Sequence, residues 1–224
     1  MLANNNEAII NKLAKNSVKT NKKQYAILFF TIILSAFMLF CVFTIGMTYL
    51  NSSRLQNTRL NGAEYDIVTM NGFTSEQLNT LQQNENIRSV GIESYAGFIQ
   101  STEYDKTVEI GLLWCDEVFW DNLMSPARTK LDGHYPQNKN ELMVTKDILK
   151  TCGNENLSVG DSLILTYENN TGVYTDEFVI SGIWDGYGDT SAGFVSKAFY
   201  DETGYDLKNN GILCIKLNCN YVFP

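Results

Sequence analysis

The sequence has few of the residues on which catalytic and metal sites most often depend. Its 224 residues include a single histidine, His134, together with five cysteines and three prolines. His134 lies in the turn-like stretch DGHYPQN without a G-x-S-x-G elbow or a flanking acid, so a turn residue is a better interpretation than a catalytic base. A single histidine and the lack of any C-x-x-C pair argue against a zinc site.

Motifs for nucleotides and calcium are missing as well. No G-x-x-x-x-G-K-[ST] sequence occurs, so the chain is not expected to bind ATP through a P-loop. The stretch DGYGD, residues 185–189, lacks the spacing of a calcium loop and its later bidentate glutamate. We therefore predict no catalytic residue, no metal site and no cofactor, and we expect a protein that is not an enzyme.

The cysteines do not predict a disulfide framework. Four of them lie outside the apolar run described below: Cys115, Cys152, Cys214 and Cys219. An oxidising exterior would permit two disulfides. Cys214 and Cys219 lie in the strand-like ILCIKLNC, where five residues span about 16 Å, too far for these two to bridge each other. Free thiols are the favoured interpretation, and the pairing of the others stays open.

The sequence does contain one long apolar segment. No charged residue occurs between Lys23 and Arg54, and the apolar segment Tyr25–Leu50 would form a helix of about 39 Å, more than the roughly 30 Å of a bilayer core. A buried helix of a soluble protein is seldom apolar on every face for so long. A signal peptide would have a shorter apolar region and a small-residue cleavage site. We predict an uncleaved transmembrane helix that ends near Tyr25 and Leu50.

The charge on the two sides of this segment is opposite in sign. Residues 1–24 carry five lysines against Glu7, a net charge of +4, so the total of −8 leaves −12 for the part after the segment. The positive-inside rule then places the N-terminus in the cytoplasm and the acidic part outside. The acidic part is not expected to bind nucleic acid, and anionic headgroups should repel it.

The segment before the span has helical periodicity. Residues 8–19, AIINKLAKNSVK, place five apolar side chains on one face and three lysines elsewhere: Ile9, Ile10, Leu13, Ala14 and Val18 against Lys12, Lys15 and Lys19. Such a basic amphipathic helix is suited to lie on the inner leaflet. A solvated, frayed tail is the alternative.

The remaining chain alternates between strand and helix patterns. The first elements expected are a strand over 63–70, a helix over 73–86, strands over 87–99 and 107–114, and a short helix over 116–123. Thr74 and Gln77 form a capping-box pattern. Asp116 is a candidate cap for the short helix, with Phe119, Trp120 and Leu123 turned inward.

The second half is richer in strands. The elements expected are a strand over 141–144, a helix from Thr145 to Gly153, β runs over 157–167 and 174–184, a helix from Ser196 to Gly204, and a strand over 212–217. The loop ENNTGV suits a hairpin between the two β runs. We predict an α+β fold with a mostly β insertion at about 155–185.

Several segments resemble the FtsX-like and MacB-like permeases, and the resemblance covers most of the chain. Residues 10–40 are similar to the start of such proteins, and NGFTSEQLNTLQQNENIRSVG resembles the helix and strand that open their external domain. LDGHYPQNKNELMVTKDIL resembles the family segment with Gly133, Tyr135, Pro136, Glu141 and Leu142. LSVGDSLILTY and EFVISGIW resemble the β block that follows.

This resemblance implies a layout and a set of partners. It implies a cytoplasmic amphipathic segment over 1–24, a transmembrane helix over 25–50, a connector over 51–62 and an extracellular MacB-like periplasmic core domain over 63–224. The family are membrane subunits of ABC transporters that act with a separate cytoplasmic ATPase. They serve export, peptide resistance or signalling, and a permease dimer is also implied.

The chain departs from the family in one respect. The family has three further transmembrane helices after the external domain, whereas this sequence contains one predicted span. We therefore expect the N-terminal portion of a permease in the cell membrane, truncated and not able to transport alone. The alternative is a self-sufficient, single-pass anchored extracellular binding or sensor protein. An anchored enzyme is a third interpretation, which the missing constellations argue against.

Overall fold

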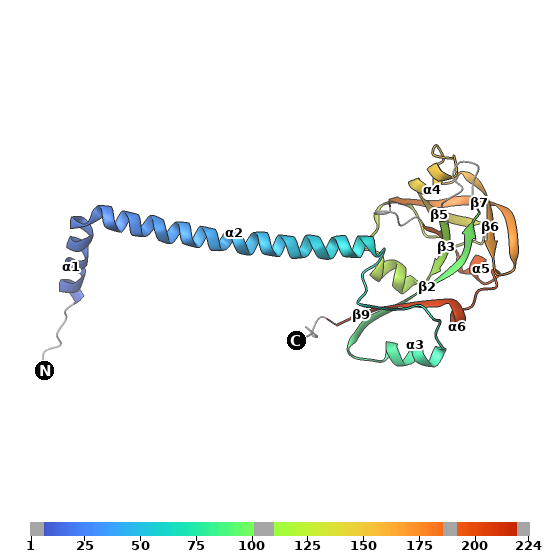
Figure 1. Cartoon of the computed structure of the whole chain (residues 1–224), viewed down its shortest axis with the longest axis horizontal. Coiled ribbons are helices and arrows are strands. Elements are labelled where there is room, and N and C mark those ends of the chain that lie inside the picture. Colours follow the sequence, from blue (N-terminus) through green and yellow to red (C-terminus); the bar gives the residue numbers. More distant parts are fainter. Residues whose placement is uncertain (1–6, 101–109, 186–191, 219–224) are drawn as a thin grey trace. The chain divides into compact units, whose positions relative to one another are not determined.

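The computed structural model describes residues 7–100, 110–185 and 192–218. Its contacts divide the chain into two units, Met1–Ser53 and Arg54–Pro224, and each is described by itself. Cys219 and residues 186–189 of the DGYGD stretch lie outside the described residues. The helices and strands are labelled in Figure 1.

Two helices make up the N-terminal part. Helix α1 is Glu7–Thr20 and helix α2 is Lys22–Leu60, so the helix continues through most of the expected connector. Among the described residues, α2 is the one helix long and apolar enough to cross a membrane. The predicted span ends, Tyr25 and Leu50, both lie within α2, and their depth in a membrane stays a prediction.

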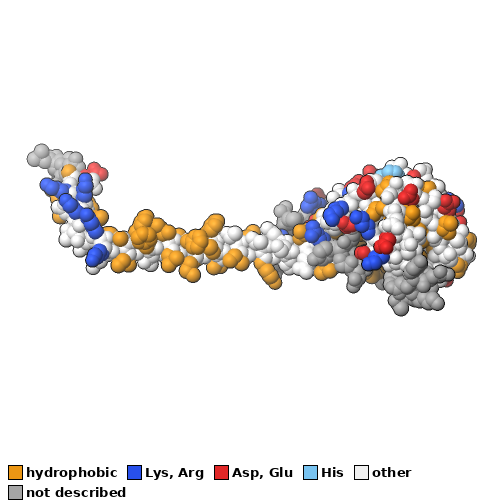
Figure 2. All heavy atoms as spheres, turned by 90° about the horizontal axis from the view of Figure 1, so that it is seen from above, with side chains coloured by type: hydrophobic (Ala, Val, Ile, Leu, Met, Phe, Trp, Pro, Cys, Tyr) orange, Lys and Arg blue, Asp and Glu red, His pale blue; other side chains and the backbone are white. Residues whose placement is uncertain are grey.

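The side chains of this unit separate by type along the chain. Lysine side chains gather on α1, and hydrophobic side chains gather on the part of α2 nearer α1 (Figure 2). The hydroxyl of Thr31 donates to the carbonyl of Ile27 at 2.8 Å, and that of Thr44 donates to Phe40 at 2.8 Å. These bonds within the helix satisfy polar groups that hydrocarbon could not.

The second unit is built on one nine-stranded sheet. Its strands are β1 Ile67–Thr69, β2 Ile87–Ile99, β3 Ile110–Cys115, β4 Thr129–Gly133, β5 Glu141–Thr145, β6 Ser162–Asn169, β7 Gly172–Asp185, β8 Ala192–Val195 and β9 Gly211–Leu217. They follow the order β1-β9-β2-β3-β8-β5-β7-β4, with β6 paired to β2 and β7. Only β3–β8 and β5–β7 are parallel among the described pairs. The mixed sheet with short helices confirms the predicted α+β class.

Part of the sheet closes on itself. The first residues of β2 pair with β9, whereas its last residues pair with β3 and, at Phe98 and Ile99, with β6. Since β6 pairs with β7, β7 with β5, β5 with β8 and β8 with β3, six strands form a ring. Gly97 permits this closure, because a Cβ there would lie 2.7 Å from the carbonyl oxygen of Glu168.

Short helices join these strands: α3 Ser75–Gln82, the π-helical turn η1 Phe119–Leu123, α4 Lys146–Thr151, α5 Lys197–Tyr200 and α6 Leu207–Asn210. The capping box of α3 is confirmed, since Thr74 Oγ1 accepts from the Gln77 N–H and Gln77 Oε1 accepts from the Thr74 N–H. Asp116 accepts from the Phe119 N–H at 2.8 Å, which confirms the predicted cap of the short helix.

Two apolar clusters stabilise the unit. The ring core draws side chains from all six ring strands, and Leu112, Leu142 and Phe178 are among its fully buried members. The outer core includes Trp120, Trp184, Phe194, Cys115 and Cys214. Phe119, Trp120 and Leu123 are buried in it, as predicted.

The β hairpin of residues 155–185 belongs to the same sheet as the rest of the unit. The boundaries at 24, 50 and 62, and the β subdomain at about 155–185, stay predictions. Sequence reasoning missed β4, β8 and α6, which have five, four and four residues and no clear periodicity.

Candidate functional site

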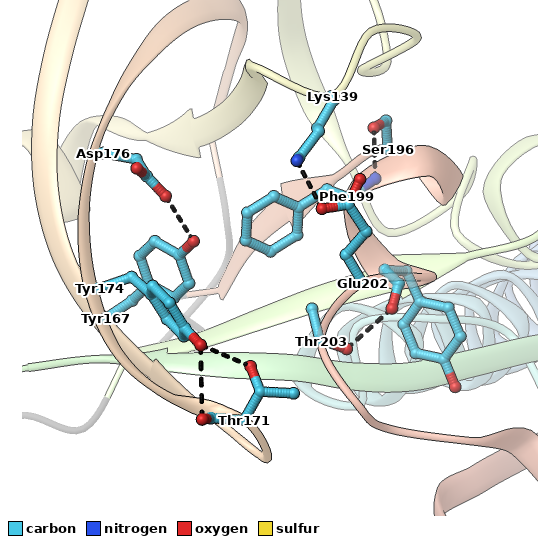
Figure 3. Close-up of polar contacts among 10 residues, drawn as sticks. Lys139, Tyr167, Thr171, Tyr174, Asp176, Ser196, Phe199, Glu202 and Thr203 are labelled. Atoms are coloured by element: carbon cyan, nitrogen blue, oxygen red, sulfur yellow. Dashed lines mark hydrogen bonds and ion pairs between the residues drawn. The ribbon is translucent and has the colours of Figure 1, made fainter.

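A polar pocket of about 300 Å³ lies between the β6–β7 hairpin and helix α5 (Figure 3). Its lining comes from segments that are distant in the sequence: Lys139, Tyr167, Asn169, Thr171, Tyr174, Asp176, Phe199, Glu202 and Thr203. The sequence did not predict this pocket. It did predict the hairpin and the helix that form its two sides.

The hairpin is held in place at its tip. Asn169 Oδ1 accepts from the backbone N–H groups of Thr171 and Gly172, at 2.8 and 3.2 Å, and so closes the two-residue turn. Asn170 Nδ2 donates to the carbonyl of Gly204 at 3.2 Å. Gly204 has φ +75°, and a Cβ there would lie 2.9 Å from Thr171 Cγ2. The tip therefore contacts the segment after α5, which fixes one end of the pocket.

Three aromatic rings form one wall. Tyr167 is only 4% exposed, and its ring lies 5.3 Å from that of Phe199 and 6.0 Å from that of Tyr174 between centroids. Tyr174 is 41% exposed and presents its ring to solvent. The Ser196 hydroxyl caps α5 by accepting from the Phe199 N–H at 3.2 Å, which fixes the position of Phe199. The wall is therefore rigid at Tyr167 and Phe199 and open at Tyr174.

Charged groups surround this wall. Tyr167 donates to Asp176 Oδ2 at 2.6 Å, and Lys139 Nζ lies 2.5 Å from Glu202 Oε2 (Figure 3). Burial, followed by the hydrogen bond and charge of Asp176, raises the pKa of Tyr167 above its ordinary value. Two carboxylates and one ammonium give the pocket a net charge of −1. The lining combines aromatic rings with charged and hydroxyl groups, an arrangement that can bind a polar ligand.

A second unusual group is a carboxylate beside the outer core. Glu93 on β2 pairs with Cys115 of β3 and Ile212 of β9, so all three lie on one face of the sheet. Burial raises the pKa of Glu93 from 4.5 to about 7. Sequence reasoning missed this residue, although a glutamate within the apolar strand IRSVGIESYAGFI was a signal that could have found it.

The residues that carried the family resemblance have structural roles. The Tyr135 hydroxyl accepts from the Cys115 N–H at 3.0 Å and lies 3.2 Å from the carbonyls of Cys115 and Val195, so it joins β3 to β8. The Glu141 carboxylate accepts from the backbone N–H groups of Gln137 and Asn138, which close the loop before β5.

His134 and the cysteines do not form a site within the described part of the chain. His134 Nδ1 lies 3.0 Å from the carbonyl of Tyr135, in a turn. Burial, then the charges of Glu93 and Asp116, raises the pKa of Cys214 to about 12, and burial also raises the pKa of Cys115. Thiols with raised pKa values are poor nucleophiles. Cys41, Cys115, Cys152 and Cys214 are free, and no group of three potential metal ligands occurs among the described residues.

The sequence matches no family model and no curated protein. Three solved structures are similar to it in fold. A domain of a protein assigned as a permease, from Porphyromonas gingivalis, is 10% identical with a TM-score of 0.44, covering 68% of this chain and 70% of that one. The extracellular domain of the noncanonic ABC-type transporter YknZ from Gram-positive bacteria is 13% identical with a TM-score of 0.42, covering 67% and 75%.

The third is the periplasmic region of MacB from Actinobacillus actinomycetemcomitans, 12% identical with a TM-score of 0.43, covering 69% of this chain and 75% of that one. At these identities the likeness concerns the fold.

Proposed function

We propose that this chain is the N-terminal portion of an ABC-transporter permease of the FtsX and MacB type. In this proposal residues 1–24 are cytoplasmic, Tyr25–Leu50 cross the membrane, 51–62 connect, and 63–224 form the external domain. The observation that carries the proposal is the order of parts: a lysine-bearing helix α1, the apolar helix α2, and an α+β unit. The resemblance of the sequence segments has the same order.

Charge supports this orientation. The segment before the apolar run has a net charge of +4 and the part after it −12. Lysines near a span favour the cytoplasmic side, and the acidic part would then lie away from the anionic inner leaflet. The apolar face of α1, which includes Ile9, Ile10 and Leu13, would rest on that leaflet.

The proposal assigns partners rather than chemistry to the chain. The partners are a cytoplasmic ABC ATPase, further permease helices and a second permease copy, and the joint activity is export, peptide resistance or transmembrane signalling. The chain alone would not transport and would not hydrolyse ATP. This agrees with the lack of a P-loop in the sequence.

The direct test is purification of the tagged full-length chain from the membranes of its source in mild detergent. An unrelated tagged single-span protein from the same membranes is the control. The expected result is a co-purifying subunit with a P-loop and vanadate-sensitive ATP hydrolysis above the control. A chain that elutes without such a subunit or activity would contradict the permease assignment.

The alternative is a single-pass anchored binding or sensor protein. The polar pocket beside the hairpin favours it, because a binding site on the external unit does not require a transporter. Ligand binding without an ATPase partner would place this alternative first.

A further inference from the structure

The pocket beside the β6–β7 hairpin has more unused hydrogen-bond acceptors than unused donors. Within the described residues, the Asp176 carboxylate accepts one hydrogen bond, from Tyr167, and the Glu202 carboxylate contacts only Lys139. An ionised carboxylate offers about four acceptor sites, so both retain most of their capacity. The Thr171 hydroxyl donates to Asn169 Oδ1 at 2.7 Å. The unused capacity is therefore chiefly for hydrogen-bond donors.

Charge and aromatic surface favour the same kind of ligand. Asp176 and Glu202 outnumber Lys139, so the pocket attracts a cation and repels an anion. The exposed ring of Tyr174 lines the same space, and aromatic faces attract cations through their quadrupole. A volume of about 300 Å³ lies at the small end of the range for ligand pockets.

We propose that this pocket binds a primary ammonium or guanidinium group, such as the side chain of a lysine or arginine in a peptide. The cation pairs with Asp176 and lies against the ring of Tyr174. Lys139 competes with the ligand cation, because its own ammonium already forms an ion pair with Glu202. Its flexible four-carbon stem and 57% exposure allow it to move aside. The proposal is independent of the permease assignment.

The test uses the full-length chain in nanodiscs of phosphatidylcholine, a zwitterionic lipid that does not itself attract cationic peptides. Isothermal titration calorimetry compares four acetylated and amidated peptides: tri-lysine, tri-arginine, tri-glutamine and tri-glutamate. The two cationic peptides are expected to bind, and more weakly as salt is raised, because part of the attraction is screened. Tri-glutamine and tri-glutamate are expected not to bind.

Three variants locate the binding. Asp176→Asn should weaken tri-lysine binding about tenfold, since a hydrogen bond to a charged group is lost. Lys139→Met should tighten it about two- to fivefold, the range expected for releasing an exposed ion pair. Glu177→Gln is the matched control, because it removes the same charge one residue further along β7. Glu177 lies on the opposite face of the hairpin and does not line the pocket. The substitution should leave the affinity unchanged.

The proposal would be overturned if tri-glutamine bound as tightly as tri-lysine, or if Asp176→Asn and Glu177→Gln changed the affinity for tri-lysine equally. It would also be overturned if Lys139→Met weakened tri-lysine binding, or if tri-glutamate bound in a manner that depends on Lys139. If Asp176→Asn does not fold, Tyr174→Leu serves instead and should weaken binding about threefold through loss of its ring. The absence of an ATPase partner would refute the permease proposal and leave these results unaffected.

Discussion

The two cores of the second unit, Arg54–Pro224, differ in what they bury. The ring core is made mainly of aliphatic and aromatic side chains, and Leu112, Leu142 and Phe178 within it are at most 1% exposed. The outer core packs Trp120, Trp184 and Phe194 around polar groups.

In the outer core, Trp184 Nε1 is buried without a hydrogen-bond partner among the described residues, and the Glu93 carboxylate lies beside Cys115. Burying polar groups without full compensation costs free energy. The comparison teaches that the ring supplies stability, whereas the outer core makes stability depend on pH and on a few hydrogen bonds.

The strongest test of the ring core is Phe178→Ala. Phe178 is 1% exposed and packs against Tyr167 and Phe199, so the truncation should lower the free energy of unfolding by about 3–5 kcal/mol. Denaturant unfolding of the full chain in detergent would measure it. Val173→Ala on the same strand, 61% exposed, is the control and should change stability by less than about 0.5 kcal/mol. Similar values for the two variants would mean that the ring encloses no true core.

The second prediction concerns the outer core and pH. The pKa of Glu93 is about 7 in the folded state against an ordinary 4.5, so the folded state binds more protons between these values. The contribution of Glu93 to the free energy of unfolding should therefore be most favourable below pH 4.5 and should be lost as the pH rises through 7. The full loss is at most about 3 kcal/mol, because Glu93 retains partial exposure.

Glu93→Gln removes this titration. Unfolding measured from pH 5 to 8.5 should show a smaller decline for the variant than for the native chain, with Glu85→Gln, on the exposed turn before β2, as the control. Parallel pH curves for the native chain and Glu93→Gln would show that Glu93 ionises freely in the folded state.

A matched pair of tyrosines compares the hydrogen bonds of the two cores. Tyr135→Phe removes the hydroxyl that accepts from the Cys115 N–H, and should lower stability by about 2 kcal/mol because a buried donor is left without its partner. Tyr200→Phe removes a bond to Ser94 Oγ, which also lies 3.4 Å from the Tyr95 and Asn210 carbonyls. It should cost about 1 kcal/mol or less. The reverse order would contradict the role of the Tyr135 hydroxyl in joining β3 to β8.

Local features were predictable from the sequence, and features made by distant segments were not. The cap at Asp116 depends on residues close in the chain, and the stretch IRSVGIESYAGFI was predicted as a strand with the bounds that β2 has, Ile87–Ile99. The burial of Glu93 depends on β3 and β9, which flank β2 in the sheet and place Cys115 and Ile212 beside Glu93. The pocket depends on Lys139 meeting Glu202, which is 63 residues away. Periodicity gives no information on such pairings.

The smallest expected effect lies away from both cores, at the start of α3. Thr74→Ala removes the side chain that accepts from the Gln77 N–H, and the loss of an N-cap should lower stability by about 1 kcal/mol. Thr74→Ser keeps the acceptor and should retain most of this stability. Both are measured by unfolding of the full chain. Since α3 contributes no fully buried side chain, its cap should act on the helix alone, with the same loss at pH 5 and pH 8.5. A loss that varied with pH would mean that α3 is coupled to Glu93 through β2.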